Sequence, residues 1–128
     1  MTMTNNKKRN WLIFFRLLQG KTVKELADTC ELSYLTYLNV ENGKIKNNHA
    51  TRCKTYALIA EKLNINMNLF FYETDESGRI IDDSCVEDVL RLFYEHNLRS
   101  LVRNEHYLRQ IFSDEITDRL LCQLHKNF

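Results

Sequence analysis

Apolar residues recur at helical spacing along most of this chain. In the first such stretch Trp11, Phe14 and Leu18 lie three, four and seven residues apart, which predicts an amphipathic helix with one face in the core. Three more short amphipathic stretches follow residue 83. Their apolar positions are Val86, Val89, Leu90, Phe93, Leu98, Leu101, Val102, Leu108, Ile111, Phe112, Ile116, Leu120, Leu121 and Leu124. The pattern predicts an all-α protein.

Residues 22–43 carry signals for two short helices joined by a tight turn. Thr22 and Glu25 form a capping box at the start of the first helix, and the small Ala27 allows a close crossing. Ser33 is a good cap for the second helix, whose buried positions should be Tyr37 and Val40. Gly43 suits the end of that helix. Such a pair is the geometry that seats a second helix in the major groove of DNA.

At these residues the sequence resembles the Cro/repressor (XRE) family of bacterial and phage helix-turn-helix regulators. The matching motifs are Thr22-x-x-Glu25-Leu26-Ala27, Ser33, Glu41-Asn42-Gly43-Lys44-x-Lys46 and a later helical run from Tyr56 to Phe70. The resemblance covers residues 9–72 and implies a five-helix lambda-repressor-like helix-turn-helix domain. It also implies a sequence-specific DNA-binding transcriptional regulator, acting as a dimeric repressor. The chain departs from the family pattern in lacking proline altogether.

The resemblance and the helical pattern together divide the chain into three parts. Residues 1–72 are the expected DNA-binding domain, and residues 83–128 are a helical segment with a thin core of its own. Residues 73–82 between them form a connector with a turn cluster ending at Gly78, which could close a short hairpin with positive φ at that glycine. The C-terminal segment should bury its apolar faces against the first part or against a second copy. We expect a homodimer, because paired recognition helices lengthen the DNA site.

The net charge of +1 conceals an asymmetry between the two halves. Residues 1–72 hold 11 Lys and Arg against 5 Asp and Glu, whereas residues 73–128 hold 7 against 12. A basic module followed by an acidic one is typical of a nucleic-acid binder with a separate assembly module. Small domains also vary by several charges without consequence, and that alternative stays open.

Two groups of residues are candidates for contact with double-stranded DNA. Backbone phosphates would be met by Arg9, Lys21, Thr22, Lys24, Lys44 and Lys46. Bases would be read by Ser33, Tyr34, Leu35, Thr36 and Asn39. Asn39 can pair with adenine, Leu35 or Thr36 can pack on a thymine methyl, and no arginine is available for guanine. An A/T-rich operator is therefore expected.

The same helix supports an alternative reading. Tyr34, Leu35 and Leu38 stand where the family more often has polar residues, and together they could form an exposed apolar patch that binds protein. The chain would then be an antitoxin-like or antirepressor-like interaction module that does not bind DNA. The resemblance also implies a partly buried ion pair between Arg16 and Glu41, which would fix helix geometry under either reading.

Other functional classes find little support. The four cysteines and four histidines show no spacing typical of a metal site, and we expect neither metal nor cofactor. No nucleophile–base arrangement or glycine-rich phosphate loop is present, so an enzyme is not expected. No apolar run approaches the roughly 18–20 residues that a membrane-spanning helix needs. We therefore expect a cytoplasmic protein without membrane contact.

Overall fold

The computed structural model describes residues 8–44, 49–95 and 104–127. Within these ranges the chain is all-helical, and only isolated β-bridges accompany the helices. The helices are α1 (Asn10–Leu18), α2 (Val23–Thr29), α3 (Tyr34–Glu41), α4 (His49–Leu63), a 3₁₀ helix η1 (Met67–Phe71), α5 (Cys85–Glu95), α6 (Glu105–Ile111) and α7 (Asp114–Asn127). The predicted all-α class is confirmed.

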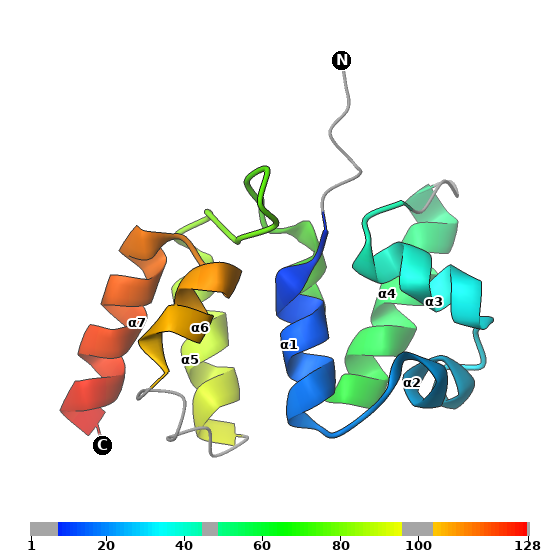
Figure 1. The fold of residues 1–128 in the computed structure, drawn as a ribbon, viewed down its shortest axis with the longest axis horizontal. Coiled ribbons are helices and arrows are strands. Elements are labelled where there is room, and N and C mark those ends of the chain that lie inside the picture. Colours follow the sequence, from blue (N-terminus) through cyan, green and yellow to red (C-terminus); the bar gives the residue numbers. More distant parts are fainter. Residues whose placement is uncertain (1–7, 45–48, 96–103, 128) are drawn as a thin grey trace.

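Helix α1 lies in the middle of the molecule, with α2, α3 and α4 on one side and α5, α6 and α7 on the other (Figure 1). It contacts both α3 and α6. Toward the first group Trp11 meets Phe70 edge-on, with 4.8 Å between ring centroids. Toward the second group Phe14 meets Tyr107 at 5.3 Å. Because α1 is apolar on more than one face, it joins both groups of helices into one core.

The apolar stripes of the C-terminal helices face this core. Buried among them are Val86, Val89, Phe93, Leu108, Ile111, Phe112, Ile116, Leu120, Leu121 and Leu124. Helix α7 packs on α5 and α6, and α6 packs on α1. The C-terminal segment was expected to bury its apolar faces against the N-terminal part or against a second copy. In this structure of a single chain they are buried within the chain, with α6 packed on α1. Leu98, Leu101 and Val102 lie outside the described residues.

The end of α1 differs from the expected core stripe. Leu18 is 39% exposed, and its neighbour Leu17 is 53% exposed. Both line a shallow hollow beside Asn104 and Tyr107. The helix ends here, and Gly20 follows the cap residue Gln19 with a φ of +69°. Phe15 and Arg16 in the same turn are buried, so only one side of the last turn is exposed.

The connector folds as a tight turn with one antiparallel bridge, between Thr74 and Ile80. Phe70 precedes this turn, belongs to η1 and is buried in the core. Gly78 takes the predicted positive φ, at +84°. It is also closely packed, since a Cβ atom there would lie 2.3 Å from the carbonyl oxygen of Lys8.

Backbone hydrogen bonds anchor the connector to the junction of α6 and α7. The Ile80 N–H donates to the Ile111 carbonyl at 2.9 Å, and the Ser113 N–H donates to the Ile80 carbonyl at 2.9 Å. The backbone N–H and carbonyl of Ile80 thus find partners in the helical layer. A two-stranded hairpin is marginally stable alone, so it needs such contacts.

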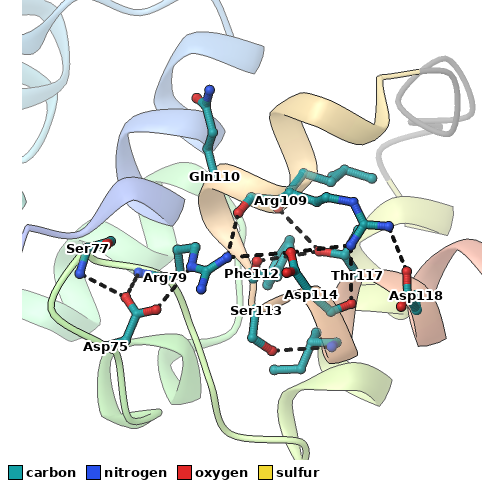
Figure 2. Close-up of polar contacts among 12 residues, drawn as sticks. Asp75, Ser77, Arg79, Arg109, Gln110, Phe112, Ser113, Asp114, Thr117 and Asp118 are labelled. Carbon is teal, nitrogen blue, oxygen red and sulfur yellow. Dashed lines mark hydrogen bonds and ion pairs between the residues drawn. The ribbon is translucent and has the colours of Figure 1, made fainter.

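A network of ion pairs covers this junction (Figure 2). Arg79 Nε lies 3.0 Å from Asp75 Oδ2, and Arg109 Nη2 lies 2.7 Å from Asp118 Oδ1. Both guanidinium groups also approach Asp114 Oδ1, at 3.6 and 3.3 Å. Although partial burial opposes it, hydrogen bonding from Arg79 holds the pKa of Asp75 below its ordinary value. Exposed pairs of this kind contribute little each, and here they mainly orient the connector.

Candidate nucleic-acid interface

The first helix of the candidate pair, α2, begins with the capping box that the sequence predicts. The Glu25 N–H donates to Thr22 Oγ1 at 3.1 Å, and the Thr22 N–H donates to Glu25 Oε1 at 2.9 Å. Donation from the Thr22 N–H holds the pKa of Glu25 below its ordinary value. The start of α2 is thus fixed, although the bond to Glu25 occupies the Thr22 N–H that a phosphate could otherwise use.

A compact turn links α2 to α3. Glu31 takes the left-handed conformation with φ +57°, and the Leu32 N–H returns to the Ala27 carbonyl at 2.9 Å. Cys30 and Ala27 are buried beneath the turn. The Thr36 N–H then donates to Ser33 Oγ at 3.0 Å and caps α3. The two helices pack directly against each other.

Helix α3 buries one face and ends abruptly. Tyr37 and Val40 are buried, as expected from their spacing. Gly43 has φ +70°, and the Lys44 N–H donates to the Asn39 carbonyl at 2.8 Å. This bond, with that from the Gly43 N–H to the Val40 carbonyl, forms a Schellman end. It places Lys44 at the C-terminal tip of α3.

The ion pair between Arg16 and Glu41 is present and ties α1 to α3. Arg16 Nε donates to Glu41 Oε2 at 2.6 Å, and the Tyr37 hydroxyl donates to the same oxygen at 2.7 Å. Arg16 Nη1 also donates to the Lys21 carbonyl at 2.9 Å. Burial, together with the bond to Glu41, raises the pKa of Tyr37. The network leaves the Glu41 carboxylate unavailable to solvent.

The opposite face of α3 is exposed and largely apolar. Tyr34 is 55% exposed and Leu35 is 64% exposed. Ser33 Oγ donates to Thr36 Oγ1 at 2.7 Å, so these two predicted base-reading hydroxyls bind each other. Asn39 is half-buried on the same helix. The structure therefore brings the five predicted base-reading residues onto one short helix and its cap, with two apolar side chains the most prominent.

The predicted phosphate contacts occupy different environments. Lys24 and Lys44 are exposed at the two ends of the helix pair, and Lys21 is half-buried before α2. Lys46 lies outside the described residues. The charge around α3 is mixed, because Asp28 and Glu31 are exposed as well. Favourable contact with a polyanion would thus depend on a few well-placed lysines rather than on a broad basic field.

Arg9 has a role that the sequence did not indicate. Its guanidinium donates to the Val40 carbonyl at 2.5 Å and to the Tyr56 hydroxyl at 3.0 Å, and it lies 5.1 Å above the Tyr56 ring centroid. Burial lowers the pKa of Arg9. The residue joins the start of α1 to α3 and α4. A phosphate contact by Arg9 stays a prediction, and it would have to compete with these bonds.

The described residues offer neither a metal-binding cluster nor a membrane-spanning helix. No group of three or more His, Cys, Asp or Glu side chains among them could hold a metal ion. None of the helices in the described ranges is long and apolar enough to cross a membrane.

Comparisons of the chain with protein-family models, with curated proteins and with solved structures find no match. The resemblance to the XRE family therefore rests on the quoted motifs alone, and function must be argued from the geometry of α2 and α3.

Proposed function

We propose that this protein is a sequence-specific DNA-binding regulator that inserts α3 into the major groove. In this proposal residues 1–72 form an XRE-like five-helix domain. The observation that carries the proposal is the division of α3 into two faces. Tyr37 and Val40 hold the helix in the core, while Tyr34 and Leu35 project outward next to its N-terminus. A recognition helix needs this combination of rigid support and a free N-terminal face.

The cations are placed to hold such a helix on the DNA backbone. Lys24 is exposed in the first turn of α2, where its ammonium group could pair with a phosphate. Lys44 follows the C-terminal tip of α3. Contacts at the two ends would fix the register of α3 without reading sequence.

We further propose that the protein acts as a homodimeric repressor in the cytoplasm. A helix of eight residues reads few base pairs, and a second copy doubles the site. In the described parts of residues 83–128, the predicted assembly segment, most residues of the apolar stripes are buried within the chain. A dimer contact in its described part would therefore have to use the remaining exposed groups, such as Tyr94.

Removal of Lys24 and Lys44 tests the proposal. We expect the Lys24→Ala/Lys44→Ala variant to bind all duplexes more weakly and to show a salt slope lower by about one unit per lost phosphate contact. Binding is measured by fluorescence anisotropy across a salt series. A control variant, Arg91→Ala/Arg119→Ala, removes two exposed cations from the C-terminal helices and should leave the slope unchanged. Equal slopes for the wild type and the lysine variant would contradict the proposal.

A second candidate function is a protein-binding module on the same scaffold. It is favoured by the exposure of Tyr34 and Leu35, because aromatic and aliphatic side chains are common anchors of protein interfaces. Such a module would show no salt-dependent retention on duplex DNA. Its interaction would be lost in Leu35→Glu while the lysine variant still bound the partner.

A further inference from the structure

The outward face of α3 has few groups that can hydrogen-bond to a base edge. The helix contains no lysine or arginine, and its one acid, Glu41, is buried against Arg16. Ser33 and Thr36 are hydrogen-bonded to each other. Asn39 is the remaining amide, and it is half-buried. The most exposed large side chains are those of Leu35, which is apolar, and Tyr34, whose ring is apolar and whose hydroxyl can form a hydrogen bond.

We infer that α3 reads DNA mainly through the 5-methyl groups of pyrimidines, with Leu35 and Tyr34 as the contacting side chains. This inference rests on the proposed function and adds the chemistry of recognition to it. The thymine methyl is the apolar feature of the unmodified major groove. Because 5-methylcytosine carries a methyl at the same ring position, the same side chains should accept it in place of thymine. Binding would then respond to cytosine methylation.

The surroundings of this apolar face favour DNA as its occupant. Lys24 and Lys44 are exposed at either end of the helix pair, where phosphates would lie on both sides of an inserted helix. Asp28 and Glu31 are exposed around α3 as well, so the preference for DNA depends on these two lysines. Removal of one buried methyl group should weaken binding about fourfold, since burial of a methylene is worth about 0.8 kcal/mol.

The test uses DNA bases that differ by a single methyl group. The tightest duplex is first selected from a random library with the full-length protein. Each thymine in it is then replaced, one at a time, by deoxyuridine, and at sensitive positions the pair is changed to C·G with and without the 5-methyl group. We expect about a fourfold loss with deoxyuridine at one or more positions. We also expect 5-methylcytosine to bind about fourfold better than cytosine there.

Protein variants assign the effect to α3. Leu35→Ala should weaken binding to the thymine duplex and abolish the response to deoxyuridine at the position that Leu35 contacts, because that methyl has lost its contact. Leu17→Ala is a matched control, since Leu17 on α1 is 53% exposed and lines the hollow beside Asn104 and Tyr107. It should keep the full response to deoxyuridine.

Three outcomes would overturn the inference in distinguishable ways. Tight, salt-dependent binding that ignores every methyl substitution would reject methyl readout and leave the proposed function intact. Failure to bind any duplex would reject the proposed function and the inference with it. A Leu35→Ala variant with unchanged DNA binding but no activity in cells would assign this face to a protein partner.

Discussion

Glu41 is the residue on which the geometry of α3 depends most. Its carboxylate accepts hydrogen bonds from Arg16 on α1 and from Tyr37 on its own helix, and the site is buried. Removal of one member of such a group leaves the others buried without a partner, which costs more than the pair itself contributes. The position of the surface that we propose faces DNA therefore depends on a buried contact between α1 and α3.

Replacement of Glu41 should show this dependence. We expect Glu41→Ala to lower the free energy of unfolding by about 3–5 kcal/mol, because the Arg16 guanidinium loses its counter-ion. Urea unfolding measures the loss. The double variant Arg16→Met/Glu41→Leu serves as control and should be much less destabilised, since no charge remains buried. A loss below about 1 kcal/mol in the single variant would show that the pair is not structural.

At the scale of elements, turns with positive φ set where helices stop. Gly20 ends α1 and Gly78 closes the connector, with φ values of +69° and +84°. The two positions differ in the space around them. Nothing lies within 4 Å of a Cβ built on Gly20, whereas a Cβ on Gly78 would meet the Lys8 carbonyl oxygen at 2.3 Å. The cost of the left-handed backbone conformation can therefore be measured separately from the cost of steric crowding.

Matched alanine substitutions make that separation. We expect Gly20→Ala to cost about 1 kcal/mol, the strain of a left-handed non-glycine residue. Gly78→Ala should cost at least about 2–3 kcal/mol, because a backbone atom must also move. Thermal unfolding followed by circular dichroism measures both. Equal losses would mean that the connector does not pack against the N-terminal segment as described.

Local signals in the sequence were sufficient to predict the caps of α2 and α3 and the residues that these helices bury. The capping box, the serine cap and the glycine end depend on residues within one or two turns, so they can be recognised without tertiary information. Three features could not be predicted in this way. The packing of α6 on α1, the inward turn of Arg9 and the bond between Ser33 and Thr36 depend on neighbours or rotamers that the sequence does not specify. The family arrangement, the domain boundaries and the DNA contacts stay predictions.

At the scale of the whole molecule, charge and packing divide the chain differently. The N-terminal half is basic and the C-terminal half acidic, yet one hydrophobic core runs from Trp11 to Leu124. Helix α1 supplies both sides of it. The charge asymmetry therefore does not correspond to two independently packed bodies.

We accordingly expect unfolding in a single cooperative transition. Trp11, the one tryptophan of the chain, reports on α1 by fluorescence, whereas far-UV circular dichroism reports on all helices. The two probes should give the same urea midpoint. A second transition seen by circular dichroism alone would show that α5, α6 and α7 unfold as a separate unit.

The affinity of the full-length protein for its best selected duplex, relative to random duplex at physiological salt, tests the central claim most directly. Sequence-specific DNA binding through α3 predicts a ratio of at least about a thousandfold. Affinity for both duplexes should fall steeply as salt is raised. Selection that enriches no sequence, with weak binding that is indifferent to salt, would contradict the claim and leave α3 as a surface for protein.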